Sequence, residues 1–70
     1  MRVRIREPRL LPTLVDSLAQ GDCVATPVDD ESCDVLLPFI QDEREARLEL
    51  RFFLRAWALQ HPGAGPELVT

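Results

Sequence analysis

The side chains in this sequence that could act as nucleophiles, general bases or soft metal ligands are two cysteines, Cys23 and Cys33, and one histidine, His61. A structural zinc site takes four ligands, usually in pairs at short spacing, and none of the three residues has such a neighbour. A thiol nucleophile needs an adjacent base, which neither cysteine has nearby in the sequence. We therefore expect no enzyme activity, no metal and no cofactor.

The composition of the chain disfavours several classes of partner. It has 12 acidic residues against eight arginines, no lysine, and a net charge of −4, which disfavours binding to nucleic acid or anionic lipid. No stretch approaches the about 18 apolar residues that span a bilayer, and no secretory leader begins the chain. We expect a soluble cytoplasmic protein, and the exclusive use of arginine is typical of a GC-rich bacterial genome.

The order of the secondary-structure elements follows from short patterns along the 70 residues, a length that predicts one domain, 1–70. Residues 2–6 alternate charged and apolar side chains, which predicts a half-buried strand. Leu11, Leu14, Val15 and Leu18 recur at helical spacing up to Gly21. Residues 42–60 predict a longer helix, with Asp42 and Glu45 as its capping pair, and residues 67–69 a last short strand.

Two further β-prone runs, 23–28 and 33–37, are separated by a short acidic segment. This segment is too short for a parallel crossover connection. The two runs must therefore form an antiparallel hairpin. Centring the hairpin on Asp30 and Glu31 places Cys23 and Cys33 on opposite faces of the sheet. The order is then βαββαβ, which predicts a ferredoxin-like α+β fold with two helices on one face of a four-stranded antiparallel sheet.

The longer helix has an unusual second apolar stripe. The first stripe, which we expect to face the core, consists of Ala46, Leu50, Phe53, Leu54 and Trp57. Leu48, Phe52 and Leu59 lie well away from it at 100° per residue. They either pack against the first helix or form an exposed partner or dimer surface.

Two sets of charged residues are most simply interpreted as solvated surfaces. Four arginines line another sector of the longer helix, but acidic residues share that helix. Arg2, Arg4 and Arg6 face the open side of the sheet, with Asp34 and Glu67 placed to form cross-strand ion pairs. The strands carry none of the aromatic residues on which RNA-binding sheets stack bases, which again disfavours nucleic acid.

Arg6 and Arg9 flank the start of the first helix, where backbone N–H groups favour an anion. The intervening segment, Glu7-Pro8-Arg9-Leu10-Leu11, resembles in outline the Asp-x-Pro-Gly-x-Leu loop of amino-acid-sensing ACT domains, with Arg9 in place of the glycine. The resemblance covers these five residues and implies a regulatory module that binds a small anion or amino acid.

Two functions from different classes follow from these patterns. The first is a noncatalytic interaction or regulatory domain that self-associates as a homodimer, through Leu48, Phe52 and Leu59 or through the open sheet face. A small core gives such a domain little stability of its own, which favours self-association. The second is the ACT-like ligand module, with Arg6 and Arg9 at its anion site.

Overall fold

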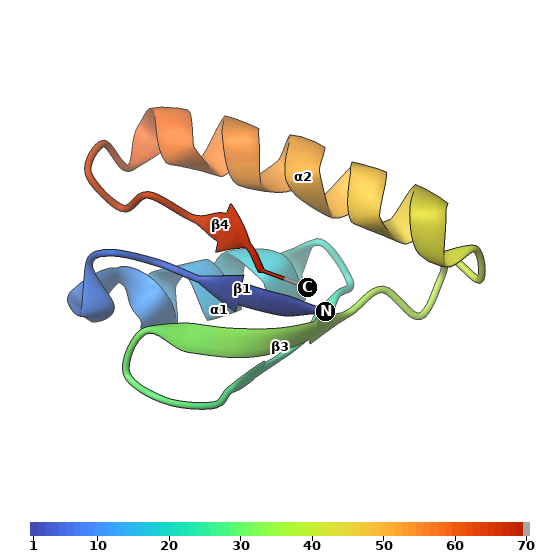
Figure 1. Cartoon of the computed structure of the whole chain (residues 1–70), viewed down its shortest axis with the longest axis horizontal. Coiled ribbons are helices and arrows are strands. Elements are labelled where there is room, and N and C mark those ends of the chain that lie inside the picture. Colours follow the sequence, from blue (N-terminus) through green and yellow to red (C-terminus); the bar gives the residue numbers. More distant parts are fainter. Residues whose placement is uncertain (70) are drawn as a thin grey trace.

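The computed structural model describes residues 1–69 and shows two helices on one face of a four-stranded antiparallel sheet (Figure 1). The strands lie in the order β2-β3-β1-β4, so the predicted ferredoxin-like arrangement is confirmed. In chain order the elements are β1 (Arg2–Arg4), a short 3₁₀ helix η1 (Pro8–Leu10), α1 (Leu11–Gln20), β2 (Val24–Pro27), β3 (Ser32–Leu36), α2 (Glu43–Gln60) and β4 (Glu67–Leu68).

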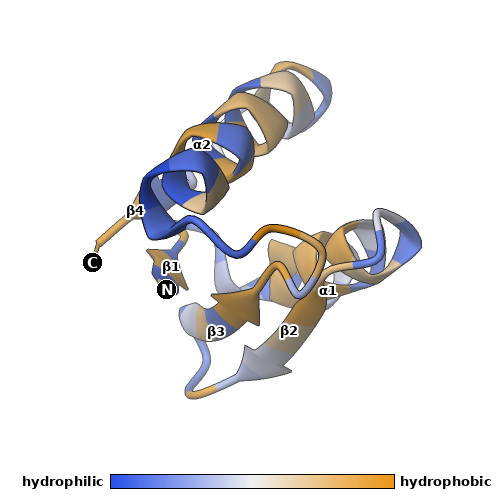
Figure 2. Cartoon of the chain, turned by 90° about the vertical axis from the view of Figure 1, so that its right-hand side faces the viewer, coloured by the Kyte–Doolittle hydropathy of each residue, from blue (hydrophilic) through white to orange (hydrophobic). Residues whose placement is uncertain are grey.

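The two helices divide the covered face of the sheet between them. Helix α1 packs on β2 and β3, while α2 runs over the side of the sheet formed by β1 and β4 (Figure 2). Helix α2 is therefore the outermost layer along most of its length, and one side of it faces away from the rest of the molecule.

The ends of the helices follow from the local sequence. Pro12 lies in the first turn of α1, where its missing N–H costs no hydrogen bond, and Gly21 ends that helix. Asp42 caps α2, because its Oδ1 accepts hydrogen bonds from the backbone N–H groups of Arg44 at 2.8 Å and Glu45 at 3.3 Å. Both helices thus lie where the sequence predicted them, whereas η1 was not predicted.

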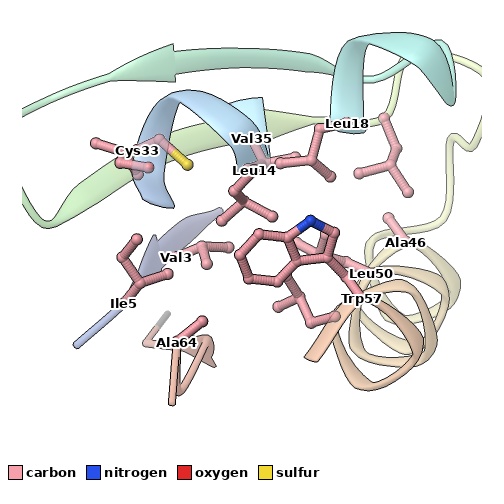
Figure 3. Close-up of a cluster of buried hydrophobic side chains, with 13 residues drawn as sticks. Val3, Ile5, Leu14, Leu18, Cys33, Val35, Ala46, Leu50, Trp57 and Ala64 are labelled. Carbon is pink, nitrogen blue, oxygen red and sulfur yellow. The ribbon is translucent and has the colours of Figure 1, made fainter. Parts of the chain in front are cut away.

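The core lies between the sheet and the two helices (Figure 3). Helix α2 contributes Ala46, Leu50, Leu54 and Trp57 to it, as the first apolar stripe predicted, with Phe53 partly buried at its edge. The other buried apolar residues are Val3, Ile5, Leu11, Leu14, Leu18, Cys33, Val35, Leu37 and Ala64. The indole Nε1 of Trp57 is buried without a hydrogen-bond acceptor among the described residues.

The register of the β2–β3 hairpin differs by one residue from the register that we predicted. Ala25 pairs with Val35 and Thr26 with Asp34, so Val24 and Thr26 face away from the core. The cause is the side chain of Asp29, whose Oδ1 accepts hydrogen bonds from Glu31 N and Ser32 Oγ, both at 2.8 Å. This contact closes a three-residue loop, and an odd loop length shifts the pairing by one position.

The same shift corrects the predicted placement of the two cysteines. Cys23 and Cys33 both pack on the core side of the sheet, and both are free thiols. If the register is extended, Cys23 lies opposite Leu37, four residues along β3 from Cys33. Four residues of strand span about 13 Å, while a disulfide needs Cα atoms within about 7 Å. Distance along the strand, not opposite faces, separates the thiols.

Candidate interaction surfaces

The second apolar stripe of α2 is exposed. Leu48, Phe52 and Leu59 are 54%, 57% and 80% accessible to solvent. At 100° per residue they lie within about 40° of one another and about 180° from Leu50, which is buried in the core. Of the two alternatives for this stripe, packing against the first helix is therefore wrong. We call these three residues the outer stripe.

A shallow hollow lies beside the outer stripe. Leu48, Arg51, Phe52 and Arg55 surround a volume of about 260 Å³ on the surface of α2. Arg51 and Arg55 are exposed and form no ion pair within residues 1–69. Arg47, by contrast, pairs with Glu43 at 3.8 Å. The outer stripe is thus bordered by two guanidinium groups that the rest of the described chain leaves unpaired.

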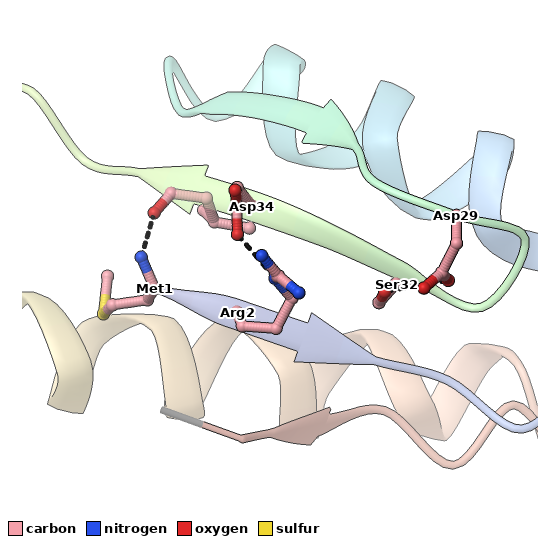
Figure 4. A network of polar contacts seen from close by, with 6 residues as sticks. Met1, Arg2, Asp29, Ser32 and Asp34 are labelled. Carbon is pink, nitrogen blue, oxygen red and sulfur yellow. Dashed lines mark hydrogen bonds and ion pairs between the residues drawn. The ribbon is translucent and has the colours of Figure 1, made fainter.

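The open face of the sheet is mainly polar. Arg2 Nε donates to Asp34 Oδ1 at 2.6 Å (Figure 4). Arg4 Nη2 lies 3.9 Å from Glu67 Oε2. Both predicted cross-strand ion pairs are thereby confirmed. Val24 and Leu36 are directly opposite each other at one end of this face, and both are exposed. This pair of exposed apolar side chains compares with three in the outer stripe.

The structure places Arg6 and Arg9 in different surroundings. The Arg6 side chain lies against Gly65, whose missing Cβ would stand 2.8 Å from Arg6 Cδ. Arg9 is 82% accessible at its side chain and its Nε lies 3.5 Å from Glu7 Oε1. The two arginines thus lie against different residues, Gly65 and Glu7. Anion binding by this pair stays a prediction.

Arg9 borders a cavity of about 550 Å³ at the start of α1, next to the β2–β3 turn. Its apolar wall comes from prolines and aliphatic side chains, and its charged rim consists of Arg9, Asp16, Asp29 and Asp30. Sequence patterns did not reveal this cavity, because it depends on the turn folding back beside α1. One positive charge against three negative ones favours a cation over an anion at this rim.

Both cysteines are at least partly buried, and the histidine lies at the end of α2. Burial raises the pKa of both thiols, with nearby Asp22 adding to the effect at Cys23 and Asp34 at Cys33, so the reactive thiolate is disfavoured. His61 ends α2, where its ring stacks on Trp57 and its Nδ1 lies 3.1 Å from the Trp57 carbonyl oxygen. Residues 1–69 contain no cluster of histidine, cysteine and acidic side chains that could hold a metal ion.

The sequence patterns did not predict the exposure of one aromatic residue, Phe39. Phe39 lies in the connection between β3 and α2 and is exposed. Loops have no periodicity from which the burial of a side chain can be predicted. Together with Phe52 and Leu59, it belongs to the exposed apolar residues that indicate an interface.

Comparison with known proteins identifies no relative: no family model matches the chain, and no curated protein or solved structure is significantly similar to it. None of the helices within residues 1–69 is both long enough and apolar enough to cross a membrane. The functional interpretation therefore rests on the surfaces described above.

Proposed function

We propose that this protein is a small noncatalytic interaction domain that self-associates as a homodimer through the outer stripe of α2. The observation that carries the proposal is the exposure of Leu48, Phe52 and Leu59 on the side of the helix opposite the core. A helix on the surface of a monomer usually presents charged and polar residues on that side. Large apolar side chains aligned there gain free energy when a partner removes them from water.

The size of the outer stripe determines the strength expected of the dimer. From residue 48 to residue 59 the helix rises about 17 Å, and three side chains cover only part of a standard interface of about 800 Å² per partner. We therefore expect a dissociation constant in the micromolar range.

The open sheet face is the less favourable of the two surfaces for self-association. A partner covering it would remove the Arg2–Asp34 and Arg4–Glu67 ion pairs from water, and desolvation of charged pairs offsets much of what burial of Val24 and Leu36 gains. The outer stripe has no charged residue among its three members. Its burial therefore desolvates no ion pair, and the charged groups beside it, Arg51 and Arg55, lie at its border.

Sedimentation equilibrium over the micromolar range tests the proposal. The wild-type chain should show a mass that rises towards that of a dimer, and Phe52→Asp should remain a monomer at every concentration. The matched control is Leu36→Asp, because Leu36 is 61% exposed against 57% for Phe52 but lies on the sheet face. Thermal melts of both variants verify that they fold.

Three outcomes would contradict the proposal. They are a monomeric wild type throughout the range, a dimer that Phe52→Asp leaves intact, and a dimer that only Leu36→Asp dissociates. The last of these outcomes would show that the chain self-associates through the open sheet face instead.

The alternative function is a small-ligand regulatory module of ACT-like outline. What favours it is the cavity of about 550 Å³ beside Arg9 at the start of α1, which is where the resemblance located a ligand. Ligand sites are usually concave and mostly apolar with a few polar groups, and this cavity has that character. The three aspartates on its rim oppose the anionic ligand that we predicted from Arg6 and Arg9.

A further inference from the structure

We infer that the two α2 helices of the dimer pair antiparallel, with Arg55 of each copy packed on Phe52 of the other and Leu48 of each on Leu59 of the other. This inference rests on the proposed self-association and specifies its geometry. It comes from the order and spacing of four side chains on the outer side of α2.

The spacing of these four residues is symmetric. Phe52 follows Leu48 by four positions, Arg55 follows Phe52 by three, and Leu59 follows Arg55 by four. Steps of three and four keep side chains on one side of a helix. If the helix direction is reversed, position 48 falls on position 59 and position 52 on position 55. In an antiparallel dimer, a two-fold axis across the middle of this segment therefore pairs Leu48 with Leu59 and Phe52 with Arg55, and no charged residue in these layers faces its own copy.

The opposite orientation brings like charges together. In a parallel dimer each residue meets its own copy, so Arg55 would face Arg55 of the second copy. Glu45 lies three positions before Leu48 on the same side of α2 and would likewise face Glu45 of the second copy. Like charges that are partly removed from water repel each other strongly. The sequence of this helix side is thus self-complementary only when the helices run in opposite directions.

The contact between Arg55 and Phe52 is chemically favourable. A guanidinium plane stacks on an aromatic ring through a cation–π interaction, and Arg55 has no acidic partner within residues 1–69. In its own chain Arg55 borders the hollow of about 260 Å³ formed with Leu48, Arg51 and Phe52. That hollow offers space for the Phe52 ring of the second copy.

Disulfide cross-linking tests the orientation directly. In a Cys23→Ser background, Leu48→Cys and Leu59→Cys are prepared as separate chains and oxidised under mild conditions, alone and mixed. The antiparallel geometry predicts cross-linked dimers in the mixture and almost none in either chain alone. A parallel dimer instead predicts that each chain cross-links to itself, and that result would overturn the inference.

The sign of the Arg55→Gln effect is an independent test. In the antiparallel dimer, loss of the cation–π contact should raise Kd by about 3- to 30-fold. In a parallel dimer the same change removes a like-charge contact and should lower Kd. The control is Arg47→Gln, an arginine of the same helix that lies about 100° from Leu48 and pairs with Glu43, for which we expect a change of less than about twofold.

The two proposals fail in different ways. A wild-type chain that sediments as a monomer overturns both the proposed function and the antiparallel geometry. A wild-type dimer that Phe52→Asp dissociates, but that Arg55→Gln strengthens or in which Leu48→Cys cross-links to itself, overturns the geometry alone.

Discussion

Arg2 Nε and Asp34 Oδ1 are 2.6 Å apart across the β1–β3 pair, on the face of the sheet that no helix covers. The hydrogen bond from Arg2, together with its positive charge, lowers the pKa of the Asp34 carboxyl below its ordinary value. The pKa of Asp29 is also lowered, first by the hydrogen bond from the backbone N–H of Glu31 and then by Ser32. Two exposed carboxylates thus have native contacts that favour the ionised form.

Stability should accordingly fall at acid pH. Because the native pKa of Asp34 lies below the unfolded value of about 3.9, the unfolded chain binds more protons as the pH drops from neutral. The stabilisation from Arg2 is present above the unfolded pKa and is lost as the pH falls through the native one. Asp34→Asn should therefore lower the urea midpoint at pH 7 and lower it much less at pH 2.

Asp16→Asn provides the comparison for that experiment, because Asp16 is exposed and forms no ion pair within residues 1–69. Its urea midpoint should follow that of the wild type at both pH values. If Asp34→Asn lowers the midpoint equally at pH 7 and pH 2, the Arg2–Asp34 contact is not the source of the acid sensitivity.

Trp57 should tolerate replacement by phenylalanine much better than replacement by alanine. Its ring is buried in the core, but its Nε1–H has no acceptor among the described residues, and an unsatisfied buried donor costs about 1–3 kcal/mol. Trp57→Phe removes that cost while leaving a smaller ring, so we expect a loss below about 2 kcal/mol, against about 3–5 kcal/mol for Trp57→Ala.

Urea unfolding followed by far-UV circular dichroism measures both Trp57 variants without relying on the tryptophan signal. Leu50→Ala, also in the core stripe of α2, gives the reference for a cavity without a change in polar groups and should cost about 2–5 kcal/mol. A loss well above about 2 kcal/mol for Trp57→Phe would show that the N–H is satisfied in solution.

The order of the elements was predictable because it depends on the length of chain between them and on contacts local in sequence. The segment between residues 28 and 33 is too short for a parallel crossover, and Asp42 marks the start of α2 by a contact local in sequence. The hairpin register was not predictable in the same way. It depends on whether Asp29 closes a loop of three residues, and this one-residue difference exchanges the faces on which Val24 and Ala25 lie.

The candidate surface was predictable in its members but not in its exposure. Helical periodicity groups Leu48, Phe52 and Leu59 on one side of α2, yet it does not say which of two apolar sides a neighbouring element covers. That choice depends on where α2 crosses the sheet, with α1 occupying the half formed by β2 and β3. The cavity beside Arg9 was missed for the related reason that it joins two segments distant in sequence.

Inorganic phosphate provides the test of the anion site predicted at Arg6 and Arg9. Because three aspartates share the cavity rim with Arg9, we expect millimolar phosphate to leave Tm unchanged relative to an equal ionic strength of chloride. A specific rise in Tm that disappears in Arg9→Ala but persists in Arg44→Ala would contradict this expectation and favour the ligand module.

Gly65 should be more sensitive to replacement by alanine than Gly63, although both have positive φ values, +57° and +89°. Each substitution strains the backbone by about 1–2 kcal/mol. At Gly65 the new Cβ would also stand 2.8 Å from Arg6 Cδ, whereas nothing lies within 4 Å at Gly63. Gly65→Ala must therefore displace the Arg6 side chain as well.

A double-mutant cycle separates the two contributions at Gly65. In an Arg6→Ala background the loss of stability caused by Gly65→Ala should shrink, since the obstructing side chain is gone, while the loss caused by Gly63→Ala should not change. Urea midpoints of the five variants and the wild type measure these differences. If Gly65→Ala costs the same with and without Arg6, backbone strain alone explains the glycine, and the packing of Arg6 over Gly65 contributes nothing measurable.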